Sequence, residues 1–384
     1  MDGLILTPGR RRFMAKSEDR FLETIDSEDE DSEVSLRGYE ILTYPADFTL
    51  EVLVGKWKKR EIKIPKLQRR FIWTQAQSSK LIESFLMGLP VPPVFFYQDR
   101  TDNKLLVIDG QQRLRTIVFF FSGLFGEPKE GKKVPSFNLT ALDEKSPYAG
   151  TTYQQLMDSD EAAFNKLQNS VLRSFVMKQL DPADDTSIFQ VFERLNTGGV
   201  VLQGQEVRNC IYEGALNNML IDLNKYPGWR KIIGKKSEDK RMRDMELILR
   251  FLALRHGMTH YKKPMKKFLN DFMKDNRNPT DLAVKKFSAE FQKTADAVVT
   301  YLGDNPFHIY RGLNVAAFDS TFTAFGKNLQ GLAEKPTSAQ TSRMRARYDK
   351  LKTDTDYVRW IVRATTDDDV VPKRIKKAEE ILFS

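Results

Sequence analysis

The sequence predicts an α+β protein, with a small mixed sheet and helices in the first half and an all-helical second half. Two observations support this prediction. Strand-like and helix-like segments alternate from Tyr39 to about residue 210. From Ile211 onward the apolar residues recur at helical spacing, and proline and glycine divide them into segments. We therefore expect a disordered acidic tail (residues 1–36), an α+β domain (37–210) and a helical domain (211–384).

The first expected elements lie between residues 60 and 109. The segment "REIKIP" (60–65) alternates like a strand. The segment "TQAQSSKLIESFLMGLP" predicts a helix that Thr74 caps and that ends at Gly88. "VPPVFFYQ" and "KLLVID" predict two strands that the turn "DRTDN" joins into a hairpin.

The later elements are more helical. The helix expected after Gly110 should be buried nearly all round, because its apolar face at Leu114, Ile117, Val118 and Phe121 is flanked by Phe119 and Phe120. Residues 127–160 predict loops and short pieces. Four further segments follow: the strand "VLRSFVMKQL", the helix "TSIFQVFERLN", the glycine-rich loop and helix "TGGVVLQGQEVRN", and the helix "MELILRFLALRHG".

Composition excludes several classes of protein. Hydrophobic residues make up 41% of the chain and aromatic residues 11%, which is enough to build a core. No apolar run reaches the roughly 18 residues that a membrane span needs. The N-terminus also lacks the apolar stretch of a signal peptide, so a cytoplasmic protein without membrane contact is expected. The single cysteine, Cys210, excludes an intrachain disulfide and a cysteine-cluster zinc site.

Charge is distributed unevenly along the chain. Residues 17–33 contain nine acids and one arginine, a net charge of −8. Because the whole chain has a net charge of +9, the remaining residues together carry +17. A body this basic attracts polyanions such as DNA. Dispersed charge also serves solubility alone, and the sequence leaves both interpretations open. The acidic run is expected to be a solvated tail.

The segment "VIDGQQR" suggests a phosphate site where a strand enters a helix. The first amides of a helix lack intrahelical partners and lie at the positive end of its dipole, which favours an anion. Arg113 adds a permanently charged fork of donors. Gln111 and Gln112 can bond a sugar, a base or water, and Asp109 could hold a Mg²⁺ that accompanies phosphates.

The same segment has a purely structural interpretation. Asp109 and Gln112 have the spacing of a capping box, which closes a helix end without any ligand. A capping Asp109 would also compete with phosphate for the amides. Spacing alone favours capping over a binding site.

Two other segments are ambiguous when taken alone. "IPKLQRRFIW" mixes basic and aromatic residues, which suits contact with nucleotides through charge and stacking. "FERLNTGGVVLQGQEVRN" contains consecutive glycines whose amides could cradle an anion. The first segment is also typical of the end of a strand, and the second of a helix C-cap followed by a flexible connection. For each segment taken alone, this structural interpretation is preferred.

The sequence gives little support for a metal site, a Walker-type nucleotide site or a nuclease site. His256 and His260 lie four residues apart, but Gly257 weakens the helix there and no acid completes a metal site. The chain has no Walker-type phosphate loop and no recognisable metal-nuclease motif. Nuclease activity of this chain alone is therefore not expected.

Taken together, the segments resemble a known family. In chain order they are "IPKLQRRFIW", "LIESFLMGLPVPPVFF", "VIDGQQRLRTI", "VFERLNTGGVVLQGQEVRN", "MELILRFLAL", "FLNDFM" and "NVAAFDSTF". This series resembles the N-terminal domain of GmrSD-type modification-dependent restriction systems, which belongs to the ParB/sulfiredoxin-like superfamily. The resemblance runs from about Tyr39 to Phe325. It implies a ParB/sulfiredoxin-like sheet and a phage-defence role in which NTP binding and hydrolysis accompany cleavage of modified DNA.

The resemblance also implies site residues and cofactors. It assigns catalysis to Asp109, Gln112 and Arg113, with Asp109 as the Mg²⁺ ligand. It assigns nucleotide contacts to residues of all three segments: Gln68, Arg69, Gly110, Gln111, Arg194, Asn196, Thr197, Gly198 and Gly199. The cofactors would be Mg²⁺ and an NTP whose base the sequence does not specify.

The expected function is an NTP-hydrolysing sensor subunit of a modification-dependent defence system. The fused enzymes of the family carry a C-terminal nuclease domain with a histidine-centred metal motif, which this sequence lacks. We therefore expect DNA as a partner and a separately encoded nuclease, and we leave self-association open. The alternatives are a ParB-like DNA-binding module without turnover, or a nuclease in its own right.

Overall fold

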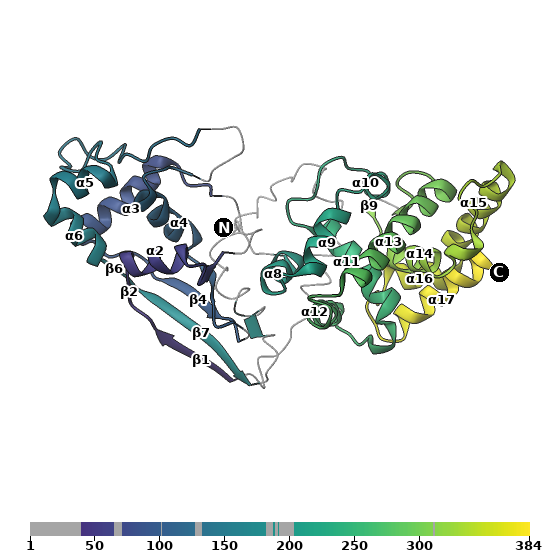
Figure 1. Ribbon diagram of the computed structural model, residues 1–384. Coiled ribbons are helices and arrows are strands. Elements are labelled where there is room, and N and C mark those ends of the chain that lie inside the picture. The colour runs from purple at the N-terminus through teal and green to yellow at the C-terminus, as the bar shows by residue number, and fades with distance from the viewer. Residues whose placement is uncertain are drawn as a thin grey trace, which may run out of the picture. The chain divides into compact units, whose positions relative to one another are not determined.

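The computed structural model describes residues 40–64, 71–100, 102–126, 133–181, 187–188, 191, 203–309 and 312–384. Within them the chain forms two compact units, one ending at Tyr212 and the next running from Glu213 to Ser384 (Figure 1). The first unit combines a mixed sheet with helices and the second is built of helices, which confirms the predicted α+β class. The predicted acidic tail lies outside the described residues.

A five-stranded mixed sheet organises the first unit, in the order β1-β7-β4-β5-β3. The strands are β1 (Glu40–Pro45), β3 (Ile62–Lys63), β4 (Val94–Gln98), β5 (Leu105–Asp109) and β7 (Ser174–Asp181). The predicted β4–β5 hairpin is confirmed, and β7 runs parallel to β4 while β3 runs parallel to β5. A separate short ladder joins β2 (Phe48–Thr49) to β6 (Val171–Leu172).

Helices cover one side of this sheet (Figure 1). The helices of the unit are α2 (Leu50–Lys58), α3 (Gln75–Met87), α4 (Gln111–Ser122), α5 (Tyr153–Ser159), α6 (Glu161–Asn169) and α8 (Gly204–Ile211). Apolar side chains of α2 to α6 form one core with Phe96, Val107 and Val176 of the sheet. Burial of these side chains is the main force that holds the helices on the strands.

The helix α3 follows the sequence prediction closely. Thr74 caps it through a reciprocal capping box, in which Thr74 Oγ1 accepts from the Gln77 amide and Gln77 Oε1 accepts from the Thr74 amide. Gly88 ends the helix in the left-handed conformation. Sequence spacing and the observed caps agree at both ends.

The helix α4 is buried nearly all round, as predicted, and among its residues Ser122 alone is exposed. The degree of burial around the helix differs from the predicted apolar face, however. Phe119 and Phe120 are buried, whereas Val118 and Phe121 are half-buried, because the helix packs against both the sheet and neighbouring helices.

Two other predicted segments differ from the structure or lie partly outside its described residues. The stretch expected to hold loops and short pieces contains the short helix α5 and two isolated β-bridges. Of the predicted helix "TSIFQVFERLN", Ser187, Ile188 and Val191 are helical, and most of its remaining residues lie outside the described part of the chain.

The second unit is a helical assembly. Its helices are α9 (Ala215–Leu223), α10 (Pro227–Ile233), α11 (Arg243–His256), α12 (Met265–Asp275), α13 (Asp281–Leu302), α14 (Val315–Lys327), α15 (Ser338–Thr353), α16 (Thr355–Val362) and α17 (Val370–Phe383). The single turns η3 (Met258–His260) and η4 (Leu329–Gly331) and a two-residue ladder of β8 (His308–Ile309) with β9 (Gly312–Leu313) interrupt them. No described helix combines the length and the hydropathy that crossing a bilayer requires.

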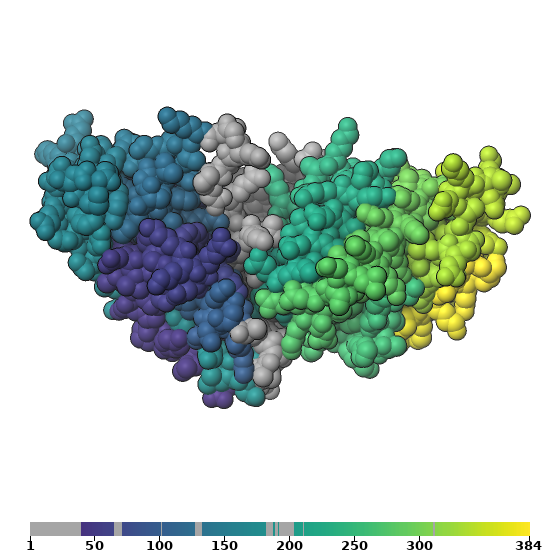
Figure 2. Space-filling view, in the orientation of Figure 1, coloured from purple at the N-terminus to yellow at the C-terminus, as the bar shows by residue number. Residues whose placement is uncertain are grey.

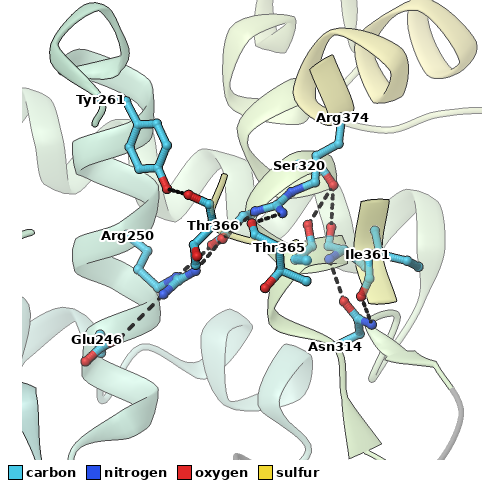
Figure 3. Close-up of polar contacts among 12 residues, drawn as sticks. Glu246, Arg250, Tyr261, Asn314, Ser320, Ile361, Thr365, Thr366 and Arg374 are labelled. Atoms are coloured by element: carbon cyan, nitrogen blue, oxygen red, sulfur yellow. Dashed lines mark hydrogen bonds and ion pairs between the residues drawn. The ribbon is translucent and has the colours of Figure 1, made fainter. Parts of the chain in front are cut away.

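A buried ion network joins three helices of this unit (Figure 3). Arg250 of α11 donates from Nε and Nη2 to the two carboxylate oxygens of Asp319 on α14, at 3.0 and 2.7 Å. Arg374 of α17 donates to Asp319 Oδ2 at 3.1 Å and to the Thr365 carbonyl. Glu246 lies 3.7 Å from Arg250, so two cations face two carboxylates. We call these four charged residues the Asp319 network.

Candidate functional site

The join between β5 and α4 holds the central motif of the sequence. Asp109 is the last residue of β5, and Gly110 follows it with a φ of +93°, in the left-handed region. A Cβ on Gly110 would lie 2.4 Å from Val94 Cγ1 of the neighbouring strand. Both the backbone conformation and the close approach therefore require glycine at this position.

The structure contradicts the capping interpretation of Asp109. The N-cap of α4 is Gly110, and no side chain in the described part of the chain caps the helix. Asp109 lies one residue too early, because the strand keeps it paired with Phe95. Its carboxylate instead accepts a hydrogen bond from Arg113, with 2.8 Å between Oδ2 and Nη2.

Arg113 is held from two sides. Its Nη2 also donates to the Pro93 carbonyl at 3.0 Å. The Arg113 side chain is 17% exposed, whereas that of Asp109 is 45% exposed. The cation is thus fixed beneath the surface, and the carboxylate remains open to solvent and to a ligand.

Gln112 connects the start of α4 to a distant part of the chain. Its Oε1 accepts hydrogen bonds from the amides of Ile72 and Trp73, at 3.0 and 3.4 Å. This fixes the segment that directly follows "KLQRR" beside the first turn of α4. Gln112 therefore positions the chain, and the catalytic role that the resemblance implies for it stays a prediction. Gln111, the first residue of α4, is half-buried.

The other predicted site residues lie outside the described part of the chain. They are Gln68, Arg69, Arg194, Asn196, Thr197, Gly198 and Gly199. The structure brings Asp109, Gly110 and Arg113 together and places the chain after Arg69 near them through Gln112. The contribution of "IPKLQRRFIW" and "FERLNTGGVVLQGQEVRN" to the site stays a prediction.

The last residues of "FERLNTGGVVLQGQEVRN" lie within the described part of the chain. They form most of α8, and their polar side chains are buried. Arg208 Nε donates to Gln205 Oε1, and Gln205 Nε2 donates to Asn209 Oδ1, both at 2.8 Å. Glu206 accepts from the Gln203 amide at 2.7 Å. Three of these side chains bond one another and Glu206 bonds a backbone amide, so these contacts help to hold the start of the helix in place.

The strand β4 contributes two residues to the site that were not predicted. Pro93 supplies a carbonyl to Arg113, and Val94 supplies the surface against which Gly110 packs. The predicted hairpin contained the signal, because antiparallel pairing puts the first residues of β4 beside the last residues of β5.

Metal binding at the site would depend on Asp109. In the described part of the chain, no group of three or more His, Cys, Asp and Glu residues is arranged to hold a metal ion. Mg²⁺ typically keeps several waters and binds through one or two carboxylates together with substrate phosphates. The half-exposed Asp109 carboxylate fits an ion that arrives with a nucleotide.

The histidines that were weighed as a metal pair have other contacts. His256 Nε2 lies 2.8 Å from Glu290 Oε2, and Arg255 also pairs with this carboxylate at 2.9 Å. Burial alone would raise the pKa of Glu290. Hydrogen bonds and charge from His256 and Arg255 outweigh this effect and hold the pKa below its ordinary value. This cluster is a surface ion-pair network rather than a metal site.

Comparison with known proteins finds one similar family, and the match falls almost entirely in the first unit. Residues 50–213 match the family model described as the GmrSD restriction endonuclease, N-terminal domain. The match covers β3, β4, β5 and α4, and so includes the whole Asp109–Arg113 segment. The search of curated proteins found no match. The match therefore supports a GmrSD-type restriction system N-terminal domain over residues 50–213.

Proposed function

We propose that this chain binds and hydrolyses a nucleoside triphosphate as the sensor subunit of a modification-dependent restriction system. The family points to restriction and phage defence. One observation carries the finer proposal: α4 begins without a side-chain cap, directly beside the half-exposed Asp109 carboxylate and the anchored Arg113. This arrangement unites an anion-binding helix start, a fixed cation and an accessible acid.

The phosphates of the nucleotide would lie at the first turn of α4. Its N–H groups and the helix dipole favour negative charge there. Arg113 adds a positive charge that needs no reorganisation, since Asp109 and the Pro93 carbonyl already hold it in place. Gly110 lets the backbone approach the phosphates closely because it lacks a side chain.

Hydrolysis would consume one water molecule. The water oxygen bonds to the terminal phosphorus, the bond from that phosphorus to the bridging oxygen breaks, and NDP leaves with the bridging oxygen. Asp109 positions the water or the Mg²⁺, and the proton of the water passes to phosphate or to solvent. When bound, Mg²⁺ would be held by Asp109 and would neutralise charge on the phosphates.

The helical unit is the part of the chain that we expect to contact DNA. Residues 213–384 contain 33 Lys and Arg against 22 Asp and Glu, a net charge of +11. The helices α15 and α17 pack together and reach the surface at the C-terminal end of the unit (Figure 2). They expose Arg343, Lys350, Lys373 and Lys376, of which Lys373 pairs with Asp369 and Lys376 with Glu380. Exposed cationic side chains favour a polyanion. A separately encoded nuclease would then cut the DNA.

Phosphate release with Mg²⁺ tests the proposal. Asp109→Ala and Arg113→Ala should lose about 99% of wild-type turnover, because charge stabilisation of this kind contributes about 10²-fold or more. Asp102→Ala and Arg100→Ala are matched controls. Asp102 pairs with Lys63 at 2.6 Å and Arg100 donates to the Leu180 carbonyl, both near the opposite end of the β4–β5 hairpin.

The outcomes separate the alternatives. Equal turnover in the wild type and in all four variants would refute the assignment of the site. Saturable NTP binding without turnover would favour a ParB-like module, whose DNA affinity should fall steeply with salt. Metal-dependent nicking of DNA by the purified chain, lost in Asp109→Ala, would favour a nuclease instead.

A further inference from the structure

One row of paired residues crosses the sheet at the end where Asp109 lies. Pro45 of β1 pairs with Phe175 of β7. Phe175 pairs with Phe95 of β4, and Phe95 pairs with Asp109 of β5. Neighbouring strands lie about 4.8 Å apart, so Phe95 is one strand and Phe175 two strands from the carboxylate. Both ends of the row reach solvent, because Pro45 is exposed and the Asp109 side chain is 45% exposed.

The two phenylalanine rings in this row are stacked. Their centroids are 5.4 Å apart and their planes differ by 19°. The adjacent residues Phe96 and Val176 belong to the core beneath the helices. Because side chains alternate along a strand, Phe95 and Phe175 lie on the opposite face of the sheet, where both are half-buried.

The strand β5 is irregular opposite this point, where Ile108 is an extra residue. The register of the β4–β5 pair shifts between Phe95 and Phe96, so Phe95 keeps its pairing with Asp109 while Phe96 pairs with Val107. Such bulges re-aim side chains and are frequent beside active sites. The residues before Phe95 already serve the site, since the Pro93 carbonyl anchors Arg113. Phe95 therefore directly continues the part of β4 that borders the site.

We propose that Phe95 and Phe175 form the surface on which the base of the nucleoside triphosphate stacks. This inference rests on the proposed function, in which the phosphates lie at the start of α4. Aromatic faces stack on every base, because each base presents a π-surface. The site should therefore distinguish a nucleotide from inorganic polyphosphate and should discriminate weakly among the four common NTPs.

Binding of ATP and of inorganic tripolyphosphate to the full chain, each with Mg²⁺ and measured by calorimetry, tests the inference. The wild type should bind ATP more tightly than tripolyphosphate. Phe95→Leu and Phe175→Leu should each weaken ATP binding about tenfold. Their affinity for tripolyphosphate should stay within about twofold of wild type, because neither ring touches the phosphate site in this arrangement. Phe95→Tyr should retain the affinity for ATP, since it keeps the stacking face.

Phe121→Leu is the matched control. Phe121 is also half-buried and stacked, with its ring centroid 4.8 Å from that of Tyr153, but it lies in the last turn of α4, away from Asp109. This variant should bind both ligands like the wild type.

Each outcome is decisive. Equal wild-type affinity for ATP and tripolyphosphate, or unchanged ATP affinity in both leucine variants, would overturn the stacking surface while the phosphate site stands. Equal losses for both ligands would show that the variants damage the fold and not a base contact, and would also overturn it. A wild type that binds neither ligand would overturn the proposed function, and the stacking surface with it.

Discussion

Two aspartate–arginine arrangements, one in each unit, show how burial decides what an ion pair does. Asp109 and Arg113 share a single hydrogen bond of 2.8 Å, and the Asp109 side chain is 45% exposed. Asp319 accepts two hydrogen bonds from Arg250 and one from Arg374, and its side chain has no exposed surface. The same two residue types thus form an open pair in one unit and a closed network in the other.

The difference has a physical reason. In the Asp319 network each charge is compensated, and removing one partner would leave charges buried without solvent or counter-ion. At Asp109 solvent already reaches the carboxylate, so it can exchange its partner for a ligand at little cost. The buried network suits the fastening of α11, α14 and α17, and the open pair suits chemistry.

The largest expected effect is on the Asp319 network. Asp319→Ala should lower the free energy of unfolding by about 3–5 kcal/mol, because it leaves Arg250 and Arg374 buried without their shared carboxylate. Asp109→Ala should cost at most about 1 kcal/mol, because the pair is partly solvated. Urea unfolding of the full chain measures both, and similar losses would break the comparison.

The next effect concerns the glycine that holds the site together. Gly110→Ala should cost about 1–2 kcal/mol for its left-handed backbone and about 1–3 kcal/mol more for the contact with Val94. Gly123→Ala is the matched control, because Gly123 is also left-handed, with a φ of +71°, but a Cβ there meets no atom within 4 Å. The difference between the two unfolding free energies isolates the close approach. Equal losses would show that the contact with Val94 relaxes freely.

A smaller effect separates the two roles of Gln112. Gln112→Met should cost about 1–2 kcal/mol, because the amides of Ile72 and Trp73 lose their acceptor. Gln112→Glu keeps an acceptor oxygen and should retain most of the stability. Its negative charge should nevertheless weaken NTP binding, which calorimetry would detect. A Gln112→Glu variant as unstable as Gln112→Met would contradict the positioning role.

The smallest effect compares two capping-box spacings in the sequence. Thr74 and Gln77 form a real capping box, so Thr74→Ala should cost about 1 kcal/mol. Asp109 and Gln112 have the same spacing but form none. Hydrogen exchange of the first-turn amides should therefore speed up in α3 of Thr74→Ala and stay unchanged in α4 of Asp109→Ala. Faster exchange in α4 would restore the capping interpretation.

Local sequence signals predicted much of the fold. The caps of α3, the β4–β5 hairpin and the glycine stop of α11 follow from residues close together in the chain. The all-round burial of α4 was predicted as well, but which of its residues are most buried was not, because that depends on which neighbouring elements pack around Phe119 and Phe120.

Some features of the candidate site were likewise predicted from the sequence, and others were not. The sequence by itself determined that a strand enters a helix through Asp109 and Gly110, since hydrophobic periodicity and a single glycine specify that join. Only the tertiary structure decided that Asp109 pairs with Arg113 and does not cap the helix. That choice depends on the pairing of Asp109 with Phe95 and on the Pro93 carbonyl beneath Arg113, contacts between strands that no local spacing encodes.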